Sequence, residues 1–240
     1  MKSSILSFFD RSAYGECIIC SKRVKKNVLA ACRDNVGICR KCFDKLPFIP
    51  VGKTFPGNKA IEYYMAVFYY KGDVPSVVSD YKFRGCLKNG EVFARLMCDL
   101  LAVYEDDYDF DLIVPVPLSK EHLKMRGYNQ AAVLAEYIAK EINVDYTECA
   151  LLKTRNTQKQ TELSPLERSE NVIGAFWADK KYVEGRRILL IDDVVTTGST
   201  VKACAGALIE SGALSVKVFS FARKYSSDKS KAYKELFNQK

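Results

Sequence analysis

The chain has 240 residues, of which 48% are apolar and 28% charged, and its formal net charge is +8. This apolar content excludes a wholly disordered chain, and the length fits one large domain or a medium domain with a small attachment. No apolar run approaches the roughly 18 residues that a bilayer span needs, and the N-terminus shows no targeting segment. We therefore expect a cytoplasmic protein without a membrane span.

Four of the nine cysteines form two C-x-x-C pairs near the N-terminus, Cys17 with Cys20 and Cys39 with Cys42. Two such turns bring four thiolates together around a tetrahedral Zn²⁺, and a closed shell of this kind is structural. Chance pairing and a redox motif are the alternative interpretations. Cys32 is a spare thiol or a substitute ligand, and its role stays open. Each of the remaining cysteines lies among apolar neighbours and is expected to be a small buried side chain: Cys86, Cys98, Cys149 and Cys204.

The segment from Cys17 to Lys45 is strongly basic, with eight Lys or Arg against two Asp. Charge of this kind suits either a solvated surface or contact with a polyanion, and it carries no sequence specificity. Under the second interpretation, the candidate nucleic-acid contacts are Lys22, Arg23, Lys25 and Lys26.

A Pro- and Gly-containing stretch follows this segment, and we expect a domain boundary near residue 52. The aromatic run Glu62–Tyr70 predicts a strand, and Gly72-Asp73 predicts a turn. Two helices are predicted next, from apolar residues at helical spacing. Their apolar faces are Val74, Val77, Val78 and Tyr81 in the first, and Val92, Phe93, Leu96, Met97, Leu100 and Leu101 in the second.

The middle of the chain continues with a buried strand from Asp111 that ends in prolines. Asn129 is expected to cap a helix whose apolar face is Val133, Leu134, Tyr137 and Ile138. A strand at Arg187–Ile191, a helix at Ser199–Ser211 and a strand at Val216–Phe221 then form a βαβ unit. These elements predict an α/β fold with a parallel sheet, and ligands bind such sheets at the carboxyl ends of the strands.

The most informative run follows the first of those strands. Asp192 and Asp193 come where the strand is expected to emerge, and a small hydroxyl-rich loop leads directly into the helix. Loop N–H groups, hydroxyls and the positive end of a helix dipole can bind one phosphate, while the carboxylates accept hydrogen bonds from sugar hydroxyls or hold Mg²⁺ through water. The loop residues are Thr196, Thr197, Gly198, Ser199 and Thr200.

Two other interpretations of this run have less support in the sequence. An acidic strand of a P-loop NTPase requires a G-x-x-x-x-G-K-[ST] partner, and the nearest match has Pro47 at the first glycine. A simple helix cap needs one polar residue, whereas this run has several. Both are weaker than a phosphate–ribose site.

The same run resembles the signature of type I phosphoribosyltransferases, which bind 5-phosphoribosyl-1-pyrophosphate (PRPP). With the four-cysteine ribbon in front, the chain resembles the ComF family of competence and DNA-uptake proteins from Cys17 to about residue 222. Further segments fall in the family's order: Tyr70–Gly72, Tyr81–Gly85, Pro115–Leu118, Arg126–Gln130 and the spread of polar residues at 157–171. The resemblance implies a zinc ribbon at 1–51, a phosphoribosyltransferase-like domain at 52–222 and a charged tail at 223–240.

By this resemblance, Asp192 and Asp193 hold the ribose hydroxyls and are the candidate catalytic residues, and Thr196–Thr200 hold the 5′-phosphate. Val194, Pro117 and Arg126 complete the expected PRPP site, with Mg²⁺ on the pyrophosphate. The implied mobile flap runs from about 155 to 171, and its candidate residues are Thr157, Gln160, Arg168 and Asn171.

Two functions follow from the resemblance. The first is a PRPP-binding accessory of single-stranded DNA uptake whose ribbon contacts DNA or an uptake helicase. The second is an active phosphoribosyltransferase, a glycosyltransferase of nucleotide metabolism, acting on a base or amine acceptor that no residue identifies. The only histidine, His122, lies among charged residues and is expected to be solvated rather than catalytic.

Overall fold

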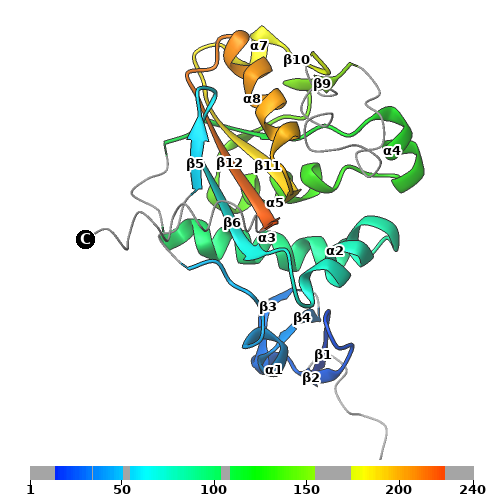
Figure 1. Cartoon of the computed structure of the whole chain (residues 1–240). Helices are drawn as coiled ribbons and strands as arrows, with labels where there is room; N and C mark the ends of the chain where they lie inside the picture. Colours follow the sequence, from blue (N-terminus) through cyan, green and yellow to red (C-terminus); the bar gives the residue numbers. More distant parts are fainter. Residues whose placement is uncertain (1–13, 34, 51–54, 104–108, 155–173, 225–240) are drawn as a thin grey trace, which may run out of the picture.

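The structure is a computed structural model, and it describes residues 14–33, 35–50, 55–103, 109–154 and 174–224. A small four-stranded sheet at the N-terminus lies beside a larger α/β unit (Figure 1). Within these ranges, no helix has the length and apolar content that crossing a bilayer demands. Residues 225–240 of the expected charged tail lie outside the described residues, whereas Arg223 belongs to a strand. The residues of the expected flap, Thr157, Gln160, Arg168 and Asn171, also lie outside the described residues.

The small sheet has the strand order β2-β1-β4-β3. β1 (Tyr14–Cys17) pairs antiparallel with β2 (Arg23–Lys25) and parallel with β4 (Val36–Cys39), which pairs antiparallel with β3 (Leu29–Arg33). A short 3-10 turn (Lys26–Val28) precedes β3, and helix α1 (Arg40–Phe43) follows β4. β1 and β4 therefore finish at the same end of the sheet, because these two strands are parallel.

This small sheet shares its apolar core with the α/β unit. Leu29, Ile38 and Leu46 are buried in the same cluster as the residues of helix α3 (Leu87–Leu101), which packs against β3 and β4. The chain then runs along the large sheet, because Ile49 N–H donates to the carbonyl of Val67 at 2.9 Å. Burial of this shared surface stabilises both parts together.

The large sheet has the order β5-β6-β12-β11-β7-β8. β5 (Phe55–Asn58) is antiparallel to β6 (Ile61–Tyr69), and the other neighbours are parallel. The remaining strands are β12 (Ser215–Arg223), β11 (Arg187–Val195), β7 (Leu112–Pro115) and β8 (Asp145–Tyr146). The predicted parallel α/β fold is confirmed, and β11 occupies the interior of the sheet, where both of its faces are covered.

Alternate residues of the central strands define two cores. Leu189 and Ile191 pack with α3, with α2 (Val74–Phe83) and with α5 (Gln130–Ile142). Ile188 and Leu190 pack on the opposite face with α8 (Ser199–Glu210). This alternation follows from the two-residue period of a strand and holds from Ile188 to Ile191. It shifts at the end of β11, where Val194 packs with the first core and Val195 with the second.

Most residues that were predicted to form the buried faces of the helices are buried in the structure. Val74, Val77, Val78 and Tyr81 of α2 are all buried, as are the predicted residues of α3 apart from the half-buried Leu100. In α5, however, Tyr137 is 38% exposed and Val133 is half-buried, so this part of the predicted face was wrong. Ala131, Ala135 and Ala139 replace them, because small side chains let α5 approach the sheet closely.

A short antiparallel pair stands apart from the large sheet. β9 (Leu151–Lys153) pairs with β10 (Phe176–Ala178), and α7 (Lys180–Val183) leads from β10 towards β11. The thiols of Cys98 and Cys204 are buried as predicted, whereas Cys86 is half-buried and Cys149 is exposed. Adjacent apolar residues in the sequence were therefore an insufficient signal of burial for these last two.

Candidate functional site

The carboxyl end of β11 is the centre of the candidate site. The strand was expected to end at Ile191, but it continues to Val195. Its partner β12 extends equally far, with Asp192 opposite Ser220 and Val194 opposite Ala222. The two aspartates are therefore held in the regular sheet rather than in a loop, and their side chains have fixed directions.

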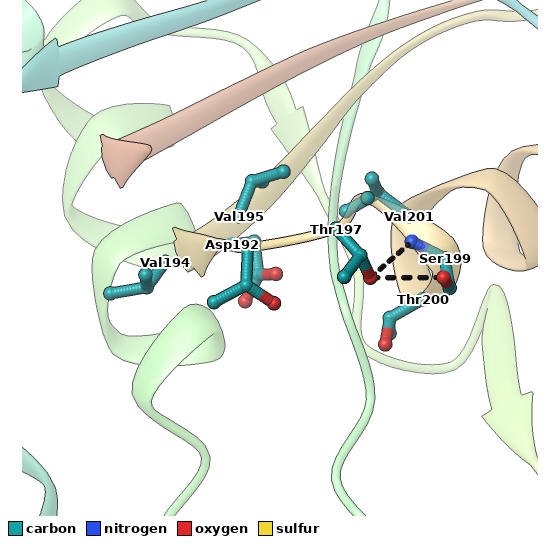
Figure 2. Close-up of a pocket in the computed structure, with 9 residues that line it drawn as sticks. Asp192, Val194, Val195, Thr197, Ser199, Thr200 and Val201 are labelled. Carbon is teal, nitrogen blue, oxygen red and sulfur yellow. Dashed lines mark hydrogen bonds between the residues drawn. The ribbon is translucent and has the colours of Figure 1, made fainter. Parts of the chain in front are cut away.

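A pocket opens between the end of β11 and the start of α8 (Figure 2). It is lined by Asp192, Val194, Val195, Thr196, Thr197, Gly198, Ser199, Thr200 and Val201. The Thr197 and Ser199 hydroxyls lie 2.9 Å apart, and the Ser199 N–H donates to Thr197 Oγ1 at 3.3 Å. The structure thus brings the predicted loop residues together around one concave surface.

Gly198 fixes the shape of this loop. It is the N-terminal cap of α8 and has φ 79°, in the left-handed region that favours glycine. A Cβ at this position would find its nearest neighbour at 3.7 Å, so backbone conformation rather than space requires glycine. The turn directs the first N–H groups of a 12-residue helix at the pocket. This arrangement suits a phosphate group.

The two aspartates lie on opposite sides of the sheet. Asp192 follows Ile188 and Leu190 in the strand alternation and lines the pocket beside α8. Asp193 follows Leu189 and Ile191 and faces α2. The sequence predicts both carboxylates at the sugar hydroxyls but does not show that the alternation of a strand separates their side chains.

Asp192 lies in an environment that disfavours its charge. Burial and the neighbouring Asp193 raise the pKa of Asp192 to about 8, while Lys82 acts in the opposite direction. One of its oxygens also accepts the N–H of Asp193 at 2.9 Å. Ligand-free Asp192 is therefore protonated over much of the range in which an ordinary aspartate is ionised.

Asp193 is buried and already has two partners. Its Oδ1 accepts the N–H of Val194 at 2.7 Å, and the Lys82 ammonium lies 2.7 Å from its Oδ2. Lys82 comes from the last turn of α2, directly after the buried Tyr81. The sequence alone does not predict a role for Lys82, although this residue lies in the segment Tyr81–Gly85 that supports the family resemblance. The signal available was a basic residue next to the buried face of a helix.

The loop after β7 lies at the same edge of the sheet. Val116 N–H donates to the carbonyl of Ile191 at 2.9 Å, which places the half-buried Pro117 beside the end of β11. Arg126 ends helix α4 (Lys120–Arg126) and donates from Nη1 to Gln130 Oε1 at 2.9 Å. Its guanidinium lies 4.9 Å from the centre of the Phe83 ring. Pro117 and Arg126 thus lie at the same edge of the sheet as the aspartates.

His122 has a structural explanation in the same helix. Ser119 caps α4 by accepting the His122 N–H at 3.3 Å, and its hydroxyl lies 3.1 Å from Nδ1 of the ring. The histidine therefore belongs to a helix cap rather than to the pocket described above.

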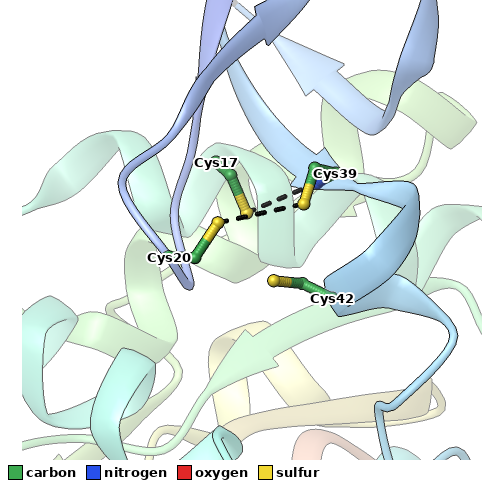
Figure 3. A group of neighbouring side chains, drawn as sticks. All are labelled: Cys17, Cys20, Cys39 and Cys42. Atoms are coloured by element: carbon green, nitrogen blue, oxygen red, sulfur yellow. Dashed lines mark hydrogen bonds between the residues drawn. The ribbon is translucent and has the colours of Figure 1, made fainter.

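The four paired cysteines converge at the end of the small sheet (Figure 3). The sulfurs of Cys17, Cys20, Cys39 and Cys42 all lie within 4.8 Å of one another, and Cys20 and Cys39 are 3.9 Å apart. Tetrahedral coordination with bonds of about 2.3 Å places ligand sulfurs about 3.8 Å apart. The cluster therefore has the dimensions of a metal site with four thiolate ligands. The side chain of Cys32 lies outside the described residues, so its role stays open.

Electrostatics also favours a cation in this cluster. Burial raises the pKa of Cys17, but backbone hydrogen bonds from Cys39, Cys20 and Ile19 outweigh it and lower the pKa to about 7. Burial and the neighbouring sulfurs raise the pKa of Cys42 well above its usual value. Four thiolates at this spacing repel one another, and a divalent cation offsets that repulsion.

The candidate nucleic-acid residues lie on β2 and its flanks. Lys22, Arg23 and Lys25 are exposed, and Lys26 is half-buried. These four residues therefore lie on β2 or directly beside it in the small sheet.

Comparison with known proteins finds one domain model and several relatives that this chain resembles. Residues 127–240 match the model of the phosphoribosyl transferase domain. DNA utilization protein YhgH of Salmonella typhi is 28% identical over 218 residues, which cover 88% of this chain and 92% of the relative. Competence protein ComFC of Bacillus subtilis is 34% identical over 163 residues, 66% of this chain and 63% of the relative.

A third relative, Competence protein F of Haemophilus influenzae, is 26% identical over 218 residues, which cover 87% of this chain and 90% of the relative. The two matches over 218 residues cover nearly nine-tenths of this chain, and the four-cysteine cluster and the parallel sheet agree with the similarity. The matched domain and these relatives support the ComF family for this chain, in which a four-cysteine ribbon precedes the matched domain.

Proposed function

We propose that this protein binds PRPP in the pocket at the end of β11 and acts as an accessory of DNA uptake or utilization. The pocket of Asp192 and the Thr196–Thr200 loop is the observation that carries the proposal. The names of the relatives, which refer to competence and DNA utilization, support the process in which it takes part.

In this proposal, different residues of the pocket bind different groups of PRPP. The loop N–H groups and the hydroxyls of Thr196–Thr200 bind the 5′-phosphate, while Asp192 accepts hydrogen bonds from the ribose hydroxyls, joined by Asp193. Mg²⁺ accompanies the pyrophosphate, and carboxylate oxygens are ligands of the hardness that it prefers. When bound, the ion would reduce the negative charge of the pyrophosphate.

Calorimetric titration tests the site directly. We expect the wild-type protein to bind PRPP in the presence of Mg²⁺, and Gly198→Ala to bind it roughly tenfold more weakly. Forcing alanine into the left-handed region costs about 1–2 kcal/mol and displaces the loop N–H groups from the phosphate. Gly206→Ala is the matched control, because Gly206 lies inside α8 with open space around its Cβ position.

The Gly206→Ala control protein should keep the wild-type affinity for PRPP. Wild-type protein that binds no PRPP would disprove the site.

The description of the matched domain as a phosphoribosyl transferase favours a second function, transfer to a base or amine acceptor. Pyrophosphate release from PRPP with a panel of nucleobases separates transfer from binding alone. The panel is necessary because the described residues do not identify an acceptor.

For the cysteine cluster we propose Zn²⁺. Four cysteines fill a tetrahedral shell and leave no position for a reacting water, so the ion would stabilise the ribbon without taking part in chemistry.

We also propose that the basic ribbon contacts single-stranded DNA, directly or together with a helicase. Lys25→Ala with Lys26→Ala should weaken single-strand binding, and the slope of log K against log salt should become shallower by about 1.4 because two phosphate contacts are lost. Lys180→Ala with Lys181→Ala removes the same charge from α7 and should leave the slope unchanged. Equal slopes for both double variants would exclude the ribbon contact. Fluorescence anisotropy at several salt concentrations measures these slopes.

A further inference from the structure

A continuous row of aromatic rings leads from the ribbon into the α/β unit. Phe43 ends α1 and directly follows Cys42 of the four-cysteine cluster. Its ring centre lies 4.9 Å from that of Phe48, and the Phe48 ring centre lies 4.5 Å from that of Phe68 in β6. The ring centres of Phe68 and of Phe221 in β12 are 5.1 Å apart. The row therefore begins beside the cysteines and enters the buried centre of the large sheet.

The same row continues to the end of α2. Phe221 stacks on Phe93 of α3, with ring centres 3.7 Å apart, and the Phe93 centre lies 5.3 Å from that of Tyr81 in an edge-on arrangement. Tyr81 comes immediately before Lys82, whose ammonium lies 2.7 Å from Asp193 of the candidate site. The aromatic row thus consists of Phe43, Phe48, Phe68, Phe221, Phe93 and Tyr81.

The end of the row beside the candidate site is tightly held. The Tyr81 hydroxyl donates to the carbonyl of Gln130 at 2.9 Å. Gly90 of α3 lies against the same ring, because a Cβ at Gly90 would lie 2.8 Å from Cε2 of Tyr81. Side chains in a close-packed interior cannot shift without moving their neighbours. A displacement of Tyr81 is therefore passed to Phe93 and along the row.

The end of the row at the ribbon is held by fewer contacts. Phe48 is 38% exposed, whereas Phe68 and every ring beyond it are at most 2% exposed. Two backbone hydrogen bonds of 2.9 Å, one on each side of Phe48, join residues 47–49 to β6. Segments with few buried contacts open locally at a lower cost than a core does. The Phe48 ring is therefore the part of the row that can leave its position while the α/β unit stays folded.

We propose that the aromatic row couples the ribbon to ligand binding at the end of β11, an inference that rests on the proposed PRPP site. Phe48 has two states, one packed between Phe43 and Phe68 and one released from Phe68. A ligand that contacts Asp193 orders the end of α2 and Tyr81, so it binds the packed state more tightly. By reciprocity, a ribbon held in place raises the affinity for the ligand. PRPP thereby regulates the order of the ribbon that is proposed to contact DNA.

Hydrogen exchange on the full-length protein prepared with Zn²⁺, with and without saturating PRPP and Mg²⁺, tests this coupling. In the wild type, PRPP should slow exchange in residues 36–46 roughly fivefold. Phe48→Leu keeps an apolar side chain but removes the ring. It should lose most of this slowing and bind PRPP roughly fivefold more weakly, although Phe48 does not line the pocket. Tyr182→Leu is the matched control, because Tyr182 is a half-buried aromatic residue of α7, at the opposite end of the molecule from the ribbon (Figure 1).

A second variant tests the row from its other end. Gly90→Ala displaces the Tyr81 ring and leaves the contacts of the ribbon unchanged, so it applies even if Phe48→Leu alone loosens the ribbon. At saturating PRPP, the ribbon of Gly90→Ala should exchange as fast as it does without ligand. Wild-type protein that binds no PRPP disproves the proposed function itself. Wild-type protein that binds PRPP with no change in ribbon exchange overturns only the coupling, as does a full ribbon response in either variant.

Discussion

Removal of the proposed zinc ion from the four-cysteine cluster is expected to unfold residues 14–46 and to lower the melting temperature of the whole protein. The strands of the ribbon have three to five residues each, and its buried apolar side chains are few. A structural zinc ion contributes about 10–16 kcal/mol in small domains, which is as large as the total stability of many proteins. Because Leu29, Ile38 and Leu46 share a core with α3, loss of the ribbon also exposes apolar surface of the α/β unit.

Hydrogen exchange followed by mass spectrometry measures this directly. Chelation and Cys39→Ser should both abolish protection in the ribbon, with a smaller loss in α3 and little change in β11 and β12. Cys149→Ser is the control, since Cys149 is an exposed cysteine outside the cluster. A ribbon that keeps full protection after metal is removed would show that its apolar contacts suffice.

Local patterns predicted the elements that surround the site. The spacing of Val74, Val77, Val78 and Tyr81 identified α2, because only one face of that helix meets the core. The α5 face was predicted less well, since Tyr137 fits the helical spacing but lies on the outer side. Alanine gives a weak signal in such patterns, although Ala131, Ala135 and Ala139 are the residues that pack.

The sequence pattern also did not predict that Asp192 and Asp193 lie on opposite faces of β11, and the reason is different. Asp192 and Asp193 are neighbours in the chain, and a loop would have let them act on one ligand atom together. The strand continues because β12 pairs with it beyond Ile191, and strand pairing depends on residues far away in the sequence. The role of Lys82 could not be predicted for the same reason. Its contact with Asp193 joins segments separated by more than 100 residues in the sequence.

The second large effect is expected from Asp192→Asn, which should stabilise the ligand-free protein at pH 8 while weakening PRPP binding. The folded protein keeps a proton on Asp192 up to a pKa of about 8, whereas an unfolded chain releases it near pH 4. The contribution of Asp192 to wild-type stability therefore becomes less favourable as the pH rises from about 4 to 8, because the folded state must retain that proton or bear the buried charge. Asparagine removes this contribution.

The difference between the two proteins is the quantity to measure. Urea unfolding at several pH values should give equal stability near pH 4 and an advantage of roughly 1–3 kcal/mol for Asp192→Asn at pH 8, less than the full shift implies because the side chain is partly exposed. Glu136→Gln, a change of an exposed carboxylate on α5, should follow the wild-type profile. If the stability difference between Asp192→Asn and wild type does not vary with pH, Asp192 is ionised in the folded state. The carboxylate would then be ready for a ligand without first losing a proton.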